Sequence, residues 1–200
     1  MKFAVLASGN GSNFEVLARS VRSGSIPAEL ALLLSDKKNA YVRQRARNLQ
    51  IPEQWLNPQD FPDRRAYDQA LKEILTREGI DFVALAGYMR ILSAEFVRSY
   101  PNKIMNIHPA LLPSFPGTDS LYRAYRHGCK VTGVTVHFVD EQVDHGPIIL
   151  QQPLLITPGM TYEELETRVH EIEHQLYPHA VRLYAAGKLL VKKNHVEIAE

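Results

Sequence analysis

The sequence predicts an α/β protein with a mostly parallel, twisted sheet and helices on both faces, in a Rossmann-like arrangement. In the first hundred residues, short apolar runs alternate with segments whose apolar residues recur at helical spacing. A glycine-rich turn, residues 8–13, joins the first apolar run to the first such segment. Alternation of this kind favours a parallel sheet, whose ligands bind outside the carboxyl ends of the strands. The turns 8–13, 87–92 and 106–117 are therefore the places to look for a site.

The first half predicts four strands separated by helices. Each expected strand is a short apolar run, and each expected helix has one apolar face. Gly79 is expected to end the third helix. The strands are expected at 3–7, 30–34, near 55–56 and at 82–86, and the helices around 14–21, at 40–49 and at 62–78.

The second half has a different character. Three prolines in residues 108–117 predict an ordered loop, and apolar–polar alternation predicts that the strand 131–139 has one polar face. Thr161 with Glu164 forms a capping-box pattern, and Pro178 is expected to disturb the helix that follows. The remaining expected elements are a strand at 104–105, a loop at 140–146, a strand at 147–156 and a helix at 161–187. With no repeat or linker in the sequence, residues 1–200 are expected to form one compact unit.

Composition argues against several classes of partner and site. The 23 basic and 22 acidic side chains nearly cancel, which argues against a nucleic-acid binder. Cys129 is the single cysteine, so neither an intrachain disulfide nor a cysteine-based zinc site is expected. No apolar run is long enough to cross a membrane, and the first residues do not resemble a secretory signal. We therefore expect a cytoplasmic protein without a nucleic-acid or membrane partner.

The turn at residues 8–13, SGNGSN, is a candidate phosphate site. Glycines let the backbone approach an anion, and the helix that follows offers free N–H groups. The third glycine of a dinucleotide motif is replaced by Phe14, and no P-loop lysine follows. The same residues also fit a plain tight turn capped by Ser12 or Asn13.

Asn106 and His108 are the candidate catalytic pair. They are expected at the carboxyl end of a strand, and on a continuing strand they would face the same side. Asn106 is suited to donate a hydrogen bond to an oxyanion, and His108 is suited to proton transfer. Asp144 is the candidate carboxylate that would raise the pKa of His108. The set suits direct attack by an amine on an acyl or formyl group, although a loop histidine and a turn-forming aspartate would also explain these residues.

Two long motifs resemble a known family, the 10-formyltetrahydrofolate-dependent formyltransferases. Residues 106–113, NIHPALLP, resemble its first signature, and 133–140, GVTVHFVD, with 144–149, DHGPII, resemble its second. Within this family, residues 8–13 and 87–92, GYMRIL, resemble the enzymes that formylate 5'-phosphoribosylglycinamide. The resemblance covers nearly the whole chain and implies the formyltransferase fold.

The resemblance implies a purine-biosynthesis reaction in which 10-formyltetrahydrofolate is the co-substrate and no metal is needed. It implies that residues 1–100 bind the ribonucleotide phosphate and that 101–200 form the folate-binding and catalytic half. His108 would be the general acid, with Asn106 on the formyl oxygen and Asp144 raising the pKa of the histidine. The ribonucleotide would contact Gly11, Ser12, Asn13, His170 and Glu173, and the folate would contact Arg64, Met89, Arg90, Ile91, Leu92, Asn106, Asp140, Glu141, Gln142, Val143 and Asp144. A monomer or a homodimer is expected.

Three residues depart from the family pattern. His170 stands where a glutamine is usual, Asp119 where a histidine is usual, and His145 where a small residue is usual. The ribose contact of His170 is thereby in question, Asp119 receives no role, and His145 would alter the 140–146 loop or face solvent. The Leu112–Pro113 bond is a candidate cis peptide.

Three other functions remain as alternatives. The H-E-x-x-H pattern of zinc hydrolases is matched by residues 170–174, HEIEH. The third zinc ligand would have to be Glu197 or Glu200, and the tail that contains them is expected to be frayed. A formyltetrahydrofolate hydrolase would share the catalytic residues but use water as the acceptor. A non-catalytic nucleotide-binding module would use the glycine turn alone.

Overall fold

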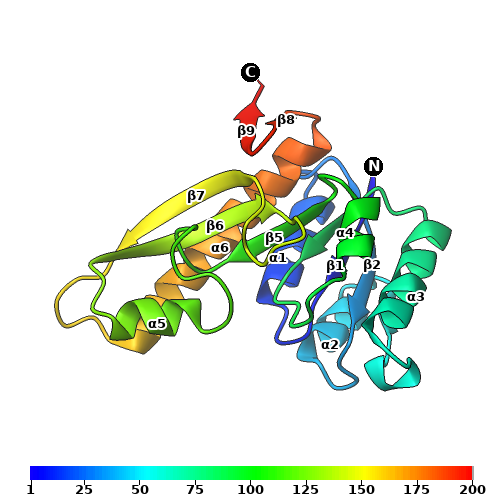
Figure 1. Ribbon diagram of the computed structural model, residues 1–200, viewed down its shortest axis with the longest axis horizontal. Coiled ribbons are helices and arrows are strands. Elements are labelled where there is room, and N and C mark those ends of the chain that lie inside the picture. Colours follow the sequence, from blue (N-terminus) through cyan, green and yellow to red (C-terminus); the bar gives the residue numbers. More distant parts are fainter. Residues whose placement is uncertain (200) are drawn as a thin grey trace.

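Nine strands form one sheet in the computed structural model, which describes residues 1–199. Figure 1 shows this sheet with the long helix α6 running along it and the two last strands at one end. The strands are β1 (Lys2–Leu6), β2 (Glu29–Ser35), β3 (Glu53–Trp55), β4 (Phe82–Leu85), β5 (Ile104–His108), β6 (Val131–Phe138), β7 (Ile148–Leu155), β8 (Leu189–Lys192) and β9 (His195–Ile198). The helices are α1 (Ser12–Arg22), α2 (Tyr41–Asn48), α3 (Arg64–Arg77), α4 (Ala94–Ser99), α5 (Ser120–Arg126) and α6 (Tyr162–Ala185), with a 3-10 turn at Pro58–Asp60.

The strand order is β3-β2-β1-β4-β5-β6-β7-β9-β8. Strands β1 to β5 pair in parallel, whereas β6 pairs antiparallel with both β5 and β7. Strand β7 pairs in parallel with β9, and β9 pairs antiparallel with β8. Because β2 and β4 lie on opposite sides of β1, the chain changes direction across the sheet at β1. A crevice at the carboxyl ends of β1 and β4 is the usual ligand site in such a sheet.

Helices cover both faces of the sheet, as the sequence predicts. Phe14 of α1, Val42 of α2 and Tyr177 of α6 pack with one set of buried residues. Tyr67 of α3 and Phe96 of α4 pack with a second set. The α/β fold class and the mostly parallel sheet are therefore confirmed.

Tyr177 anchors α6 to the centre of the sheet. Its buried hydroxyl lies 2.8 Å from the carbonyl oxygen of Leu85 and 3.1 Å from that of Met105, on the adjacent strands β4 and β5. Burial holds the pKa of this hydroxyl well above its ordinary value, so it remains a hydrogen-bond donor. The central part of α6 is thereby fixed next to the strand that carries the catalytic candidates.

Two local predictions around the last helix and the proline loop are confirmed. Thr161 and Glu164 form a reciprocal capping box at the start of α6. The Leu112–Pro113 peptide is cis. The expected disturbance at Pro178 is wrong, because α6 continues through this residue to Ala185.

The sequence prediction is also wrong for parts of the second half. The expected polar face of β6 is present, but its Thr135 and His137 are buried, at 0% and 1% exposed. The expected frayed tail instead forms the β8–β9 hairpin, whose Glu197 pairs with Lys192; Glu200 lies outside the described residues. Helix α4, which the alternation of apolar runs did not reveal, begins at a Ser93 cap. No helix among residues 1–199 has the length and apolar character needed to cross a membrane.

Candidate active site

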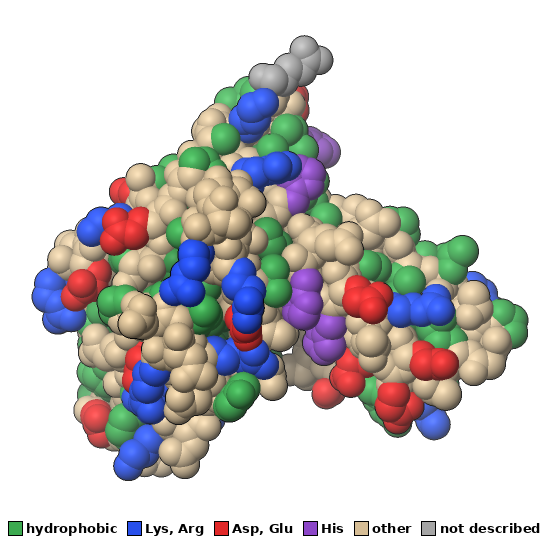
Figure 2. All heavy atoms as spheres, turned by 180° about the vertical axis from the view of Figure 1, so that it is seen from behind, with side chains coloured by type: hydrophobic (Ala, Val, Ile, Leu, Met, Phe, Trp, Pro, Cys, Tyr) green, Lys and Arg blue, Asp and Glu red, His purple; other side chains and the backbone are tan. Residues whose placement is uncertain are grey.

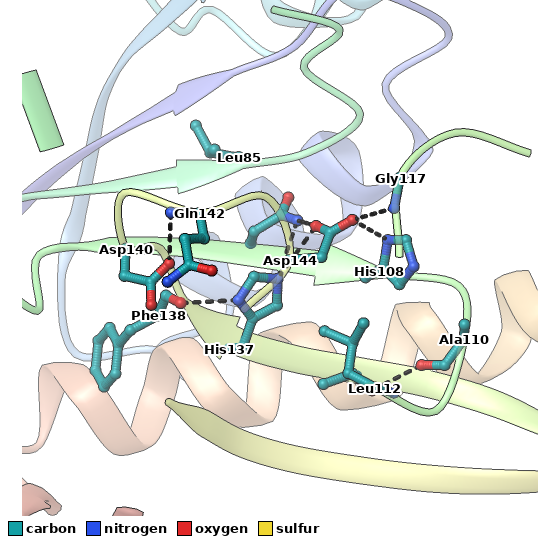
Figure 3. A network of polar contacts seen from close by, with 12 residues as sticks. Leu85, His108, Ala110, Leu112, Gly117, His137, Phe138, Asp140, Gln142 and Asp144 are labelled. Carbon is teal, nitrogen blue, oxygen red and sulfur yellow. Dashed lines mark hydrogen bonds and ion pairs between the residues drawn. The ribbon is translucent and has the colours of Figure 1, made fainter. Parts of the chain in front are cut away.

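The three predicted catalytic residues meet at the end of β5. Asn106 and His108 both lie on this strand, which is longer than expected. Asp144 reaches them from the loop between β6 and β7: its Oδ2 lies 3.3 Å from Nδ1 of His108, and Nδ2 of Asn106 lies 3.4 Å from its Oδ1. Figure 3 shows the Asp144 carboxylate facing the imidazole of His108. The cluster is thus assembled from two segments that are far apart in the sequence.

The proline loop closes over the carboxylate. The Gly117 N–H donates a hydrogen bond of 2.7 Å to Oδ2 of Asp144, and the Phe115 carbonyl lies 2.9 Å from Nε2 of His108. Asp144 itself has a left-handed backbone, with φ at 52°, which turns its side chain into the site. The loop therefore holds both ends of the His108–Asp144 pair.

A buried hydroxyl supports the proline loop from below. Thr135 of β6 donates to the Ala110 carbonyl at 2.7 Å and accepts from the Leu112 N–H at 3.1 Å. Gln151 of β7 donates to the Leu112 carbonyl at 2.9 Å. These bonds explain why Thr135 is polar in a buried strand and how the loop after His108 is kept in place.

The charge state of His108 differs from the prediction. Burial lowers the pKa of His108, while the Phe115 carbonyl and Asp144 raise it, and the net shift is below the ordinary value. Asp144 thus acts in the expected direction, but the expected net increase is wrong because desolvation of the buried imidazole is the larger effect. Burial of Asp144 raises the pKa of its carboxyl, but the Gly117 N–H and His108 lower it, and the net shift is below the usual range. These shifts favour the carboxylate form of Asp144 and the neutral form of His108 in the free site.

His137 is a site residue that the sequence prediction missed. The register of β5 and β6 places it directly opposite Asn106, and its Nε2 lies 3.2 Å from Nδ2 of Asn106. Its Nδ1 lies 2.8 Å from the Phe138 carbonyl, so the proton belongs on Nδ1 and Nε2 accepts from Asn106. The buried imidazole thereby fixes which end of the Asn106 amide carries the N–H groups. An antiparallel pairing of residues 104–108 with 135–138, had it been predicted, would have revealed this contact.

The glycine turn lies between β1 and α1, as predicted. Gly11 has φ at 81°, and a Cβ there would lie 2.3 Å from Cγ2 of Val42, so both conformation and packing require glycine. None of the described side chains caps the first turn of α1, whose N–H groups at Ser12 and Asn13 follow Gly11. Helix α2 holds the turn, since the Val42 N–H donates to the Gly9 carbonyl at 3.1 Å. The turn is therefore a preformed backbone site suited to an anion.

Asn13 and Glu173 connect this turn to α6. Nδ2 of Asn13 donates to Oε2 of Glu173 at 3.0 Å, and the same oxygen lies 3.1 Å from Nδ1 of His170. Glu173 is 5% exposed, and its contact with His170 raises the pKa of that histidine. Figure 2 shows the reverse face hollowed between two lobes, with histidine side chains gathered beside the hollow. All five predicted ribonucleotide residues thus lie close to one another, around the start of α1.

Comparison with known proteins agrees with this geometry. A family model described as formyl transferase matches residues 1–181. The chain belongs to the formyl transferase family. It is 44% identical to phosphoribosylglycinamide formyltransferase of Bacillus subtilis over 181 residues, which is 90% of this chain and 93% of the relative. It is 40% identical to the enzyme of the same name from Haemophilus influenzae, over 96% of this chain and 91% of the relative.

Solved structures give the same result. Glycinamide ribonucleotide transformylase 1 from Symbiobacterium toebii matches with a TM-score of 0.97 at 42% identity, over 100% of this chain and 94% of the other. A formyltetrahydrofolate deformylase from Pseudomonas syringae pv. tomato matches with a TM-score of 0.91. That second likeness, at 24% identity and over 66% of the deformylase, shows the shared fold alone. The predicted formyltransferase fold is therefore confirmed.

The segment that the family resemblance assigns to folate follows β4. Met89 and Ile91 are 69% and 61% exposed, so two apolar side chains of this segment are open to contact with a ligand. The segment is held from α3, where the Tyr67 hydroxyl lies 3.0 Å from that of Tyr88 and the Arg90 guanidinium lies 4.4 Å from the Tyr67 ring. Arg64 is the exposed first residue of α3.

The loop 140–144 is stabilised by polar contacts at its ends. Asp140 accepts from the Gln142 N–H at 2.9 Å, and its other oxygen lies 2.6 Å from Nδ1 of His145. Glu141 pairs with Arg98 of α4 at 2.9 Å, and Val143 is 51% exposed. His145, a departure from the family pattern, therefore contacts the loop itself. Its imidazole thereby connects the two ends of the loop, at positions 140 and 145.

The remaining departures lie between α5 and α6. Asp119 precedes α5 with φ at 54°, and it lines a cavity of about 150 Å³ together with Pro109, Tyr162, His170 and Glu173. The zinc alternative finds no support in this region. Nδ1 of His170 contacts Glu173, and residues 1–199 contain no group of three or more His, Cys, Asp or Glu side chains placed to hold a metal ion.

Proposed function

We propose that this protein transfers the formyl group of 10-formyltetrahydrofolate to the amine of 5'-phosphoribosylglycinamide. The products are formylglycinamide ribonucleotide and tetrahydrofolate, a step of purine biosynthesis. The observation that carries the proposal is the cluster of Asn106, His108 and Asp144 at the carboxyl end of β5, at the same edge of the sheet as the turn at Gly11. The relatives that match over nearly their whole length carry the name of this activity.

Asn106 stabilises the oxyanion. The amine nitrogen forms a bond to the formyl carbon, and the carbonyl electron pair moves to the formyl oxygen. An N–H of Asn106 donates to that oxygen. In the free site Nδ2 of Asn106 lies 3.2 Å from Nε2 of His137 and 3.4 Å from Oδ1 of Asp144, so the formyl oxygen replaces one of these two partners. The carbon–nitrogen bond to the folate N10 then breaks as the carbonyl re-forms. Neither substrate needs a covalent bond to the protein.

His108 transfers the proton that the reaction must move. The attacking amine loses a proton and the departing N10 gains one, so one group can serve both steps. Because its pKa is lowered, free His108 is neutral and is ready to accept the proton from the amine. Asp144 then stabilises the imidazolium at 3.3 Å until the proton passes to N10. His108 thus acts first as a general base toward the amine and then, as the imidazolium, as a general acid toward N10.

The two halves of the chain have different tasks. In residues 1–100, the N–H groups at Gly11, Ser12 and Asn13 bind the phosphate, and in residues 101–200 Glu173 binds the ribose, with His170 held at its carboxylate. The exposed apolar residues at 89–92 and the loop 140–144 contact the pterin and benzoyl rings, with Arg64 near the glutamate end. The folate is a co-substrate in this scheme, and no step is routed through a metal.

Assay of the purified protein with both substrates tests the proposal. Mixing 10-formyltetrahydrofolate with 5'-phosphoribosylglycinamide should produce the absorbance change of tetrahydrofolate release and a formylated ribonucleotide. Folate release in water alone, with no dependence on the ribonucleotide, would establish a hydrolase instead. Zinc bound one-to-one, with activity lost on chelation, would establish the metallohydrolase.

The cytoplasmic location and the monomeric or homodimeric state stay predictions from the sequence. Sedimentation at assay concentration distinguishes a 22.7 kDa monomer from a dimer of twice this mass.

A further inference from the structure

The hydroxyl of Ser8 joins three strand ends at the edge of the site. Ser8 follows β1, Asp36 follows β2, and Met89 lies in the segment after β4. The Ser8 Oγ donates to Oδ1 of Asp36 at 2.5 Å and accepts from the Met89 N–H at 2.8 Å. The Ser8 N–H also donates to the Gly87 carbonyl at 3.1 Å, so Ser8 contacts the segment at two points.

Asp36 determines the direction of this hydroxyl. A carboxylate only accepts hydrogen bonds, so the single hydroxyl proton of Ser8 must point at Asp36. A lone pair of the oxygen is then left facing the Met89 N–H. Without Asp36, the hydroxyl could rotate and turn its proton toward Met89, which would lose the bond.

Asp36 is itself confined by burial. It is 4% exposed, and a buried carboxylate is costly unless it is hydrogen-bonded. Among the described residues, Ser8 is the side chain that donates a hydrogen bond to the Asp36 carboxylate. The Lys37 ammonium is 3.9 Å from this carboxylate, on a side chain that is 62% exposed. The Asp36–Ser8 pair is therefore a fixed unit under the edge of the site.

Ser8 also belongs to the glycine turn. The turn is held against α2 by the Gly9–Val42 hydrogen bond and by Arg45, whose Nε donates to the Asn10 carbonyl at 3.0 Å. An anion bound at Gly11 to Asn13 would hold this preformed turn more firmly, and with it Ser8. The segment 87–92 would then be ordered through the Met89 bond, although its own side chains at 89 and 91 lie open to solvent.

We propose that Ser8, oriented by Asp36, is a positioning residue that couples the ribonucleotide site to the folate site. Binding of either substrate fixes the Ser8–Met89 bond and thereby favours binding of the other. The coupling is reciprocal, because each ligand must change the affinity of the other by the same factor. The inference rests on the proposed function, since it takes the 8–13 turn and the 89–92 segment as the two substrate sites.

Steady-state kinetics of Ser8→Ala give the first test. KM for 10-formyltetrahydrofolate should rise about 3- to 10-fold, the factor that corresponds to one lost hydrogen bond, while kcat changes less than twofold. Ser8→Thr keeps the hydroxyl and should restore KM. Ser23→Ala, which removes an exposed serine hydroxyl at the other end of α1, is the matched control and should leave both constants unchanged. An unchanged KM in a folded Ser8→Ala enzyme would overturn the inference, as would a loss confined to kcat.

Calorimetric binding gives the second test. Tetrahydrofolate, which carries no formyl group, is titrated with and without saturating 5'-phosphoribosylglycinamide. The unaltered enzyme should bind it several-fold more tightly with the ribonucleotide present, and this ratio should fall to about one in Ser8→Ala. Equal ratios in the two proteins would overturn the inference.

Asp36→Asn decides the question if Ser8→Ala does not fold. Its neutral amide keeps the size of the side chain but no longer dictates where the Ser8 proton points, so the coupling ratio should fall part of the way. A full ratio in folded Asp36→Asn would overturn the role of Asp36. Failure of the proposed function gives a different result, because neither the unaltered enzyme nor any variant would then formylate the ribonucleotide.

Discussion

The glycine turn and the catalytic cluster sit at the same edge of the sheet but are built in different ways. The turn is continuous in sequence and uses backbone groups, with Gly11 fitted against Val42. The cluster uses side chains from β5, β6 and the loop at Asp144, and each depends on another to stay in place. A backbone site is thus specified by conformation and packing, whereas the cluster is specified by register and hydrogen-bond direction.

The difference predicts how each region fails when a residue is changed. A substitution in the turn should act on folding and on ribonucleotide affinity together, because the same backbone atoms do both. A substitution in the cluster should act on turnover with little effect on folding. Four changes, from the largest expected effect to the smallest, test this division.

Removing the proton carrier should have the largest effect. His108→Ala should lower kcat about 10²- to 10⁴-fold, the contribution typical of general acid–base catalysis, with little change in KM for the ribonucleotide. His127→Ala, an exposed histidine after α5, is the matched control. Full kcat in folded His108→Ala would remove this histidine from the mechanism, as the binding-module alternative requires.

Gly11→Ala should break the turn. A left-handed alanine costs about 1–2 kcal/mol, and forcing its Cβ against Val42 costs about 1–3 kcal/mol more in the free energy of unfolding. KM for the ribonucleotide should rise in the same variant. Gly24→Ala has a similar φ of 78° with nothing within 4 Å of the added Cβ, so it isolates the cost of the backbone conformation. Equal losses of stability in the two variants would show that the Val42 contact relaxes.

His137→Phe should have a smaller effect on turnover. The ring is kept, but the acceptor that fixes the Asn106 amide is lost, and one hydrogen bond is worth about 1 kcal/mol, or roughly fivefold in kcat. His137→Gln, whose side-chain oxygen can accept from Asn106, should recover part of the loss. Equal activity of the two variants would argue that His137 only fills space.

Asp144→Asn should move the titration of His108. Asp144 raises the pKa of His108 against the larger lowering by burial, so loss of the charge should shift the NMR midpoint to still lower pH. Both midpoints should lie below the ordinary value near 6.5. Because the folded-state pKa is depressed, His108 contributes stability above pH 6.5 that is lost as the pH falls through the folded-state midpoint. A midpoint that rises in Asp144→Asn would contradict the assigned charges.

The fold could be predicted mainly where sequence pattern reflects local structure. Alternating apolar runs identified β1, β2, β4 and three helices, because a strand buried on both faces is a continuous apolar run. Strand β3 was expected near 55–56 but lies at Glu53–Trp55, because its residues are half-buried and only one of them is apolar. The same rule failed for β6, where Thr135 and His137 are polar but buried, since each bonds to a neighbouring segment. The β8–β9 hairpin was missed because its side chains are largely exposed and short strands carry little pattern.

The site residues could be predicted where they lie in a sequence motif, but not where the pairing of strands brings them together. The resemblance of 106–113 and 144–149 to family signatures placed Asn106, His108 and Asp144 in one site, and the structure brings them together. His137 and the Ser8–Asp36 pair depend on strand register and order, which single-residue patterns do not contain. The net pKa of His108 depends on burial, which was not available from the motif.

The end of the sheet farthest from β3 limits how two copies of this chain can associate. Strand β7 is covered at Ile148 by β9, and further along it Pro153 lacks the N–H that a new strand would need. The outermost strand, β8, has four residues and ends in Lys192. Figure 1 shows β8 and β9 at one end of the molecule. Short, lysine-bearing edges are poor templates for a strand of another molecule. Self-association through a sheet continued from one molecule to the next is therefore disfavoured at this end, both in a dimer and in early aggregates.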